Sequence, residues 1–238
     1  DTVVADEVAH QKMHAMKRLN RRIQRSLLSF NELVAGTPST PSQLRGLFTW
    51  LQASAQSVLP VPAAHRPTAA QNITTPVDEV TETAFMAFLK ACYDHKLDMV
   101  DLDGFVGSDL KAQIDTFTIY DQTASGVAAL RMYNYDGTKG TVSRNVSILK
   151  SSFGVCRLHL TSDCVRTQAT GAASAYTPKS GAFVDMDMFE LRHAKKGVPT
   201  NFTLADDGSG PKGYIDALLG LYCNSPVGQG YIYTNAAT

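Results

Sequence analysis

The chain has 238 residues, of which 44% are hydrophobic and 18% charged, a composition typical of a globular protein with enough chain for a sizeable core. Its 22 basic and 22 acidic residues cancel, which argues against a dedicated nucleic-acid binder and against intrinsic disorder, because both classes normally carry a large net charge. No apolar stretch approaches the roughly 20 residues that a membrane-spanning helix needs.

The first predicted element is a long amphipathic helix over residues 6–34, which would extend about 40 Å at the usual rise per residue. Gly36 ends the pattern. A helix of this length at the start of a chain usually serves as a strut. Its apolar residues recur at steps of three and four, as on one face of a helix: Met16, Leu19, Ile23, Leu27, Phe30 and Val34.

The other faces of this helix are basic, with six cations and no acid between residues 12 and 25. Such a stripe suits nucleic-acid phosphates. The neutral total instead favours simple solvation or contacts with acidic surfaces of neighbouring subunits. Lys12 is the first of the six cations, and the other five are the subunit-contact residues that we expect: Lys17, Arg18, Arg21, Arg22 and Arg25.

The segment after this helix is irregular. A turn-rich hinge over residues 37–41 precedes a short helix that Ser42 would cap and that would run through Trp50. Residues 53–76 are rich in Pro, Ala, Gln and Thr and lack periodicity, so they are predicted to form an irregular surface loop. A second amphipathic helix is predicted over residues 77–95.

From residue 99 onward the pattern is a mixture of helix and strand. Alternating apolar and polar residues predict strands over 99–106, 127–135, 144–150, 155–160 and 182–193. A further helix would begin at a Ser108 cap, and Phe153-Gly154 marks the turn between two of the strands. Loops are predicted over 167–180 and 207–213, a core segment over 214–223, and a last strand over 230–233.

Motifs that carry known chemistry are missing from the sequence, which has no G-x-S-x-G, H-E-x-x-H or P-loop pattern. His10 and His14 would share a helix face but lack a third ligand. Asp101-Leu-Asp103-Gly resembles the middle of a calcium loop, yet carboxylates are missing at the first and twelfth positions of that loop. The sequence therefore predicts neither a metal nor a cofactor.

Two aspartates and the thiols need separate consideration. Asp185 and Asp187 alternate on the predicted strand 182–193 and would share a face, where they could act as an acid pair. An exposed strand edge or a subunit contact is the alternative. The four cysteines are sparse and widely spaced, without a C-x-x-C motif, which favours reduced thiols in a cytoplasmic setting.

The order of several segments along the chain is distinctive. The basic helix continues into Glu32-Leu-Val-Ala-Gly36-Thr and residues 43–50, and the helix 77–95 leads to Asp103-Gly-Phe-Val-Gly-Ser108. In this order they resemble the spine helix and the axial-domain entry of the major capsid proteins of tailed bacteriophages (Caudoviricetes), which share the Hong Kong 97 fold. Further resemblances to this family lie over residues 110–117, 147–155, 183–192 and 212–233.

The resemblance implies an α+β chain with a Hong Kong 97-type capsid fold. Residues 1–98 would form the spine helix and the first part of the peripheral domain, residues 99–180 the axial domain, and residues 181–238 the return strands that close the axial/peripheral sheet. Loops near residues 122–126 or 168–180 would meet around a ring axis.

The function that the resemblance implies is structural: a major capsid protein, not an enzyme, that self-assembles into an icosahedral virion shell around phage DNA. Its partners would be copies of itself in hexamers and pentamers, packaged DNA held without sequence-specific contacts, and decoration or scaffolding proteins. The resemblance implies no cofactor and no membrane. Assembly would take place in the host cytoplasm.

The chain also departs from that family. An N-terminal arm and an extended loop normally precede the spine helix, whereas almost nothing precedes residue 6 here, as cleavage, trimming or missing density would explain. The alternatives are a cellular nanocompartment shell, another virion structural protein, or an unrecognised enzyme that uses Asp185 and Asp187. If the basic stripe makes subunit contacts, charge reversal at Arg21 and Arg22 should impair assembly.

Overall fold

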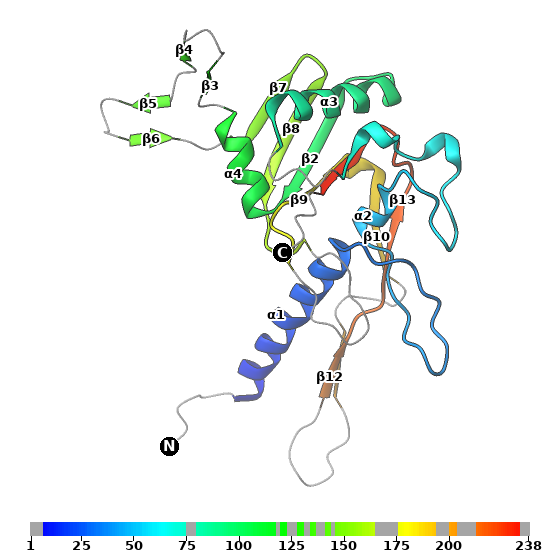
Figure 1. Cartoon of the computed structure of the whole chain (residues 1–238). Coiled ribbons are helices and arrows are strands. Elements are labelled where there is room, and N and C mark those ends of the chain that lie inside the picture. Colours follow the sequence, from blue (N-terminus) through cyan, green and yellow to red (C-terminus); the bar gives the residue numbers. More distant parts are fainter. Residues whose placement is uncertain are drawn as a thin grey trace.

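The computed structural model describes residues 7–74, 80–117, 120–122, 128–130, 134–136, 141–143, 146–164, 176–193, 200–203 and 213–233. Among the described residues the α-helices all lie between Glu7 and Thr116 and most of the strands follow them, so the predicted α+β class is confirmed. Figure 1 shows a central sheet with helices packed against it and one long helix that projects away from the sheet.

The projecting helix, α1, spans Glu7–Leu27 and is shorter than predicted. The last backbone bond of the helical type joins the Leu28 amide to the Gln24 carbonyl, at 2.9 Å. Ser29 then donates its hydroxyl to the Ser26 carbonyl, and the chain turns so that Phe30 stacks on Phe48 with ring centroids 4.4 Å apart. The apolar spacing beyond residue 27 therefore reflects tertiary packing, and the prediction of helix to residue 34 was wrong.

The next helix, α2, is a single turn over Leu47–Trp50 whose N-cap is Gly46. The predicted Ser42 cap was wrong, because the neighbouring Gln43 lies outside the helix and forms an antiparallel bridge with Val34. The following segment contains the 3-10 turns η1 (Ala63–His65) and η2 (Ala69–Gln71) and the short strand β1 (Asn72–Ile73). It is more ordered than the predicted surface loop, and the side chains of Gln56 and Gln71 are buried.

The helix predicted over 77–95 is confirmed as α3, Glu82–Lys96; residues 75–79 lie outside the described part of the chain. Thr81 is its N-cap, and its hydroxyl accepts a hydrogen bond from the Ala84 amide at 3.2 Å. The helix ends at Leu97, which has a positive φ of 57°.

The central sheet has six strands in the order β1-β14-β9-β2-β8-β7. The strands besides β1 are β2 (Val100–Val106), β7 (Ile148–Ser151), β8 (Gly154–Leu160), β9 (Ser180–Val184) and β14 (Gly230–Tyr233). Strands β2 and β8 run parallel, as do β1 and β14, and the other pairs are antiparallel. The sheet thus joins strands from distant parts of the sequence.

The turn predicted at Phe153-Gly154 is confirmed between β7 and β8. Gly154 has a φ of +149°, and a Cβ there would lie 1.9 Å from the Val100 carbonyl oxygen, so only glycine fits. The helix after β2 is α4, Ser108–Thr116. Its N-cap is Gly107, so the predicted Ser108 cap was wrong by one residue, and the Ser108 amide donates instead to the Tyr176 hydroxyl.

Both faces of the sheet carry apolar cores, because side chains alternate along each strand. Helices α3 and α4 cover one face, where Phe85 and Phe88 contact Phe183 with ring centroids 5.4 and 5.2 Å apart. The other face packs against α2 and the end of α1 through a second cluster that includes Phe48 and Tyr231. Each fully buried aromatic side chain contributes roughly 1.5–3 kcal/mol relative to exposure.

The remaining strands form two-stranded ribbons: β10 (Phe189–His193) with β13 (Leu219–Cys223), β11 (Thr200–Thr203) with β12 (Gly213–Asp216), β3 (Tyr120–Gln122) with β4 (Ala128–Leu130), and β5 (Asn134–Asp136) with β6 (Thr141–Ser143). The predicted single strand over 127–135 is divided between two ribbons, with residues 131–133 outside the described part. Residues 144–145 are also outside it, and so are 165–175 and 204–212 from the predicted loops.

Within the described residues, none of the helices has the length and apolar character needed to cross a membrane.

Candidate functional site

The cations of α1 separate into two groups. Arg25 and Arg21 point toward the body of the chain, where their Nε atoms lie 3.3 and 4.0 Å from Oδ1 of Asp163. Asp163 follows β8 and is itself largely buried. These two arginines therefore tie the C-terminal half of α1 to the sheet within one subunit.

The other predicted contact residues of α1, Lys17, Arg18 and Arg22, are exposed to solvent. The structure shows no ion pair between them and any described residue of the same chain. Figure 1 shows that α1 extends away from the sheet toward its N-terminal end, so that half of the helix lies clear of the body. Its apolar stripe is accordingly only half-buried at residues such as Met16 and Leu19.

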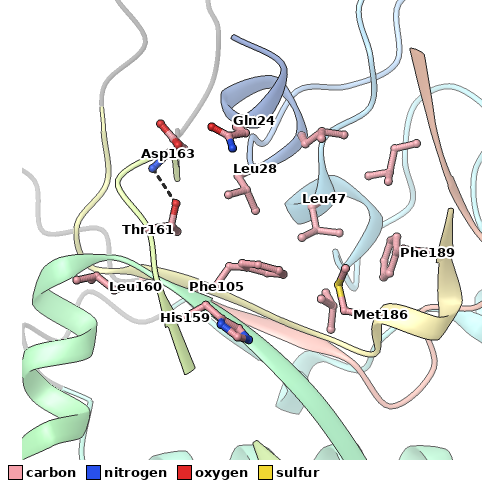
Figure 2. Close-up of a pocket in the computed structure, with 13 residues that line it drawn as sticks. Gln24, Leu28, Leu47, Phe105, His159, Leu160, Thr161, Asp163, Met186 and Phe189 are labelled. Carbon is pink, nitrogen blue, oxygen red and sulfur yellow. Dashed lines mark hydrogen bonds between the residues drawn. The ribbon is translucent and has the colours of Figure 1, made fainter. Parts of the chain in front are cut away.

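An apolar pocket of about 430 Å³ lies under the last turn of α1. Figure 2 shows Leu28 and Leu47 on one side of this hollow and Phe105 on the sheet opposite, with Met186 and Phe189 closing one end. Asp163 and Thr161 stand at the other end, where the Asp163 amide donates to the Thr161 hydroxyl at 3.1 Å. The pocket is open to solvent and lined mainly by aliphatic and aromatic side chains, so it suits an apolar group.

A row of paired charges lies beside the pocket on the same face of the sheet. The two terminal guanidinium nitrogens of Arg157 donate to the Asp101 carboxylate, at 2.6 and 2.9 Å, and His159 Nε2 lies 3.0 Å from Oδ1 of Asp103. The hydrogen bond and charge of Asp101 raise the pKa of Arg157. Because their partners are basic side chains, these two aspartates do not form a cation site.

The prediction that Asp185 and Asp187 share a strand face was wrong. Strand β9 ends at Val184, and Asp185 caps the 3-10 turn η3, Met186–Met188, by accepting from the Asp187 amide at 3.2 Å. The Asp185 carboxylate also binds Lys96 at 3.0 Å. Asp185 therefore has a structural role in joining η3 to the end of α3, and no acid pair forms.

Metal-binding clusters of three or more histidine, cysteine or acidic side chains are missing from the described residues. The His10 and His14 rings contact each other on exposed α1, with a 3.1 Å separation between their Nε2 atoms. All four cysteines are free and buried. Burial raises the pKa of the Cys92 and Cys156 thiols to about 12, so these groups are unsuited to nucleophilic chemistry.

The described residues thus present exposed charged side chains on α1 and an apolar pocket beneath its last turn. The model of the SU10 major capsid protein family matches residues 1–236, and a comparison with curated proteins found no match. The chain is thus a structural protein of a phage virion, a subunit of a multimeric shell. It belongs to the SU10 major capsid protein family, which confirms the predicted capsid role.

Sequence reasoning identified the basic face of α1 but missed Asp163 and the pocket. Asp163 follows a strand that is distant from α1 in sequence, and its role appears only when the two segments meet. The pocket is likewise formed by segments that are far apart in the sequence: the end of α1, α2, three strands of the central sheet, η3 and the β10–β13 ribbon. One signal was available for η3, because an aspartate side chain often begins a turn by accepting a hydrogen bond from the backbone amide two residues further on.

Proposed function

We propose that the chain forms an icosahedral head shell of the Hong Kong 97 type, built from hexamers and pentamers of this subunit around packaged phage DNA. The observation that carries the proposal is the family match over nearly the whole chain. A closed lattice of this kind is stable although each contact is modest, because every subunit is held by several neighbours. The zero net charge also suits close packing of identical subunits.

In this proposal, residues 1–98 comprise the spine helix and the first part of a peripheral domain. Residues 99–180 form an axial domain, and residues 181–238 return to close the sheet between them. The projection of α1 from the body supports its role as a spine helix (Figure 1). The loops proposed to meet at a ring axis, near residues 122–126 and 168–180, lie largely outside the described residues.

The cations on the basic face of α1 would have two roles in the shell, one between subunits and one within a subunit. Lys17, Arg18 and Arg22 are exposed and would contact acidic surfaces of neighbouring copies, whereas Arg21 and Arg25 would mainly hold α1 on its own subunit through Asp163. Packaged DNA would be enclosed without base-specific contacts. Decoration or scaffolding proteins would add to this lattice, which would assemble in the host cytoplasm.

We further infer a structural rather than a catalytic role for the chain. The carboxylate pair that an enzyme alternative requires does not form, since Asp185 is bound to Lys96. The charged side chains beside the pocket are paired with each other, Arg157 with Asp101 and His159 with Asp103.

The native mass of the full encoded product tests the shell proposal. Mass photometry combined with electron microscopy of any large species should reveal closed particles of megadalton mass. A monomer that persists at high concentration and in the presence of scaffold protein would contradict the proposal. The contents separate a virus from a nanocompartment, because phage heads should hold DNA and nanocompartments a protein cargo.

A further inference from the structure

A buried arginine holds the loop that follows α2. Arg45 is only 3% exposed, and its two terminal nitrogens donate to the carbonyl oxygens of Val58 and Leu59, the second at 3.2 Å. The guanidinium also lies over the Trp50 ring, 4.5 Å from its centroid. Burial lowers the pKa of Arg45, although the charge of Glu32 opposes this effect. The guanidinium of Arg45 is thus removed from water, and its hydrogen bonds to two backbone carbonyls offset part of that cost and hold the loop in place.

The side chains of the fixed residues point into solvent. Leu59 is 73% exposed and Val58 is 40% exposed. Leu59 also has a φ of 47°, in the left-handed region that non-glycine residues avoid, and it precedes Pro60, which restricts its backbone further. We refer to these two side chains as the Val58–Leu59 knob. Strain that the surrounding structure maintains is typical of functional surfaces.

The loop around the knob is also fixed from inside. Gln56 is buried, donates to the Thr49 carbonyl at 3.0 Å and accepts from the Val61 amide at 3.0 Å. The Arg66 Nε donates to the Val61 carbonyl at 2.6 Å. A loop held in this way loses little conformational freedom when it binds, so the knob is preorganised for a contact.

The apolar pocket under α1 offers matching chemistry elsewhere on the chain. Its lining is mainly aliphatic and aromatic, and two more exposed apolar side chains, Leu160 and Met186, stand among its lining residues. Leu160 is 65% exposed and Met186 is 49% exposed. The residues that line the pocket do not include the knob of the same chain. The knob and the pocket therefore form two complementary apolar surfaces at different places on one subunit.

We propose that the Val58–Leu59 knob of one copy inserts into the α1–sheet pocket of a neighbouring copy. The proposal rests on the shell function, because membership of a capsid family means that copies of this chain contact each other. A contact between two different surfaces of identical subunits is heterologous, and it propagates from copy to copy into a closed ring or an open filament instead of ending at a dimer. The rings of the proposed hexamers and pentamers require a contact of this type.

Disulfide trapping in assembled shells tests this contact. The variant Leu59→Cys/Leu160→Cys should give a ladder of covalent multimers on a non-reducing gel after treatment with oxidised glutathione. Each single variant controls for links between identical positions. The double variant Leu97→Cys/Leu160→Cys is the matched control and should stay monomeric on the gel, because Leu97 is also an exposed leucine with positive φ but lies outside the knob. The native cysteines are buried and should not interfere.

A second variant tests the knob contact if the cysteine variants do not assemble. Leu59→Asp should lower the yield of shells about tenfold or more, because a carboxylate would have to enter an apolar pocket. Leu97→Asp should assemble like the wild type, and both variants should keep wild-type circular dichroism. Intact shells without the 59–160 link, or normal assembly of Leu59→Asp, would overturn the knob contact and leave the shell role standing. A wild-type chain that forms no shell would overturn both.

Discussion

Gly46 shows how one missing side chain allows α2 to pack against the end of α1. A Cβ at this position would lie 2.0 Å from the Ser29 carbonyl oxygen. Its φ is an ordinary −76°, so the requirement is for space and not for backbone freedom. We expect Gly46→Ala to lower the free energy of unfolding by about 3 kcal/mol, since overpacking forces the backbone apart. Urea denaturation of the unassembled subunit measures this.

Gly220 provides the matched control for this substitution, because nothing lies within 4 Å of the Cβ that Gly220→Ala would add. That variant should change the free energy of unfolding by no more than about 0.5 kcal/mol. Equal losses in the two variants would show that the contact between Gly46 and Ser29 does not set the packing.

Asp185 and Asp187 should respond differently to truncation. Asp185 binds Lys96 and caps η3, and both charged groups are largely buried, so Asp185→Ala should cost about 2 kcal/mol in unfolding free energy. Asp187 is exposed, and Asp187→Ala should change the unfolding free energy by no more than about 0.5 kcal/mol. Thermal unfolding of both variants measures the difference, and equal effects would contradict the structural role of Asp185.

At the scale of elements, apolar periodicity predicted where helices and strands exist better than where they end. The helix 77–95 and the strands near 99–106 and 155–160 were predicted correctly, because the periodic spacing of their apolar residues reflects one buried face of a regular element. The spacing of Phe30 also fits a helix, yet Phe30 reaches the core from irregular chain by stacking on Phe48. Likewise, the alternation over 182–193 conceals the turn where the chain leaves the central sheet and begins β10.

The N-terminal half of α1 should be stabilised mainly by assembly. Residues 7–15 of this half are exposed wherever their side chains are described, and an isolated helix of this length is marginal in water. We expect their backbone amides to exchange hydrogen rapidly in free subunits and at least about tenfold more slowly in shells. Exchange measured by mass spectrometry on both states tests this. Strand β2, which is buried in the sheet, is the control and should be protected in both; unchanged exchange in α1 would show that it makes no subunit contact.

At the scale of the whole molecule, the sequence predicted most of the helices and strands but not the order in which the strands pair in the sheet. Strand β14 lies between β1 and β9, and β2 pairs in parallel with β8. Which strands become neighbours depends on long-range packing, and the alternation of residues within one strand does not predict its pairing partner. The pocket shares this origin, because it exists only where α1, the sheet and η3 meet. The basic face of α1 could be predicted because it depends on helical spacing alone.

The division of the α1 cations predicts separate effects on assembly and on stability. Arg18→Glu/Arg22→Glu should leave the unfolding free energy of the subunit within about 0.5 kcal/mol of the wild type, since both side chains are exposed. It should nevertheless prevent shell formation near physiological salt, with partial recovery at about 1 M salt, where the Debye length falls to about 3 Å. Mass photometry across a salt series measures both conditions.

The matched variant at the tethered position is Arg25→Ala. It removes a partly exposed ion pair with Asp163 and should cost at most about 1 kcal/mol in unfolding free energy, with shells still forming. If both expectations hold, the cations of one helix have separate roles: Arg25 holds α1 on its own subunit, and Arg18 and Arg22, closer to the N-terminus of α1, hold it against the next. Normal shells from Arg18→Glu/Arg22→Glu at every salt concentration would remove these arginines from the interface and leave the apolar stripe of α1 as its contact surface.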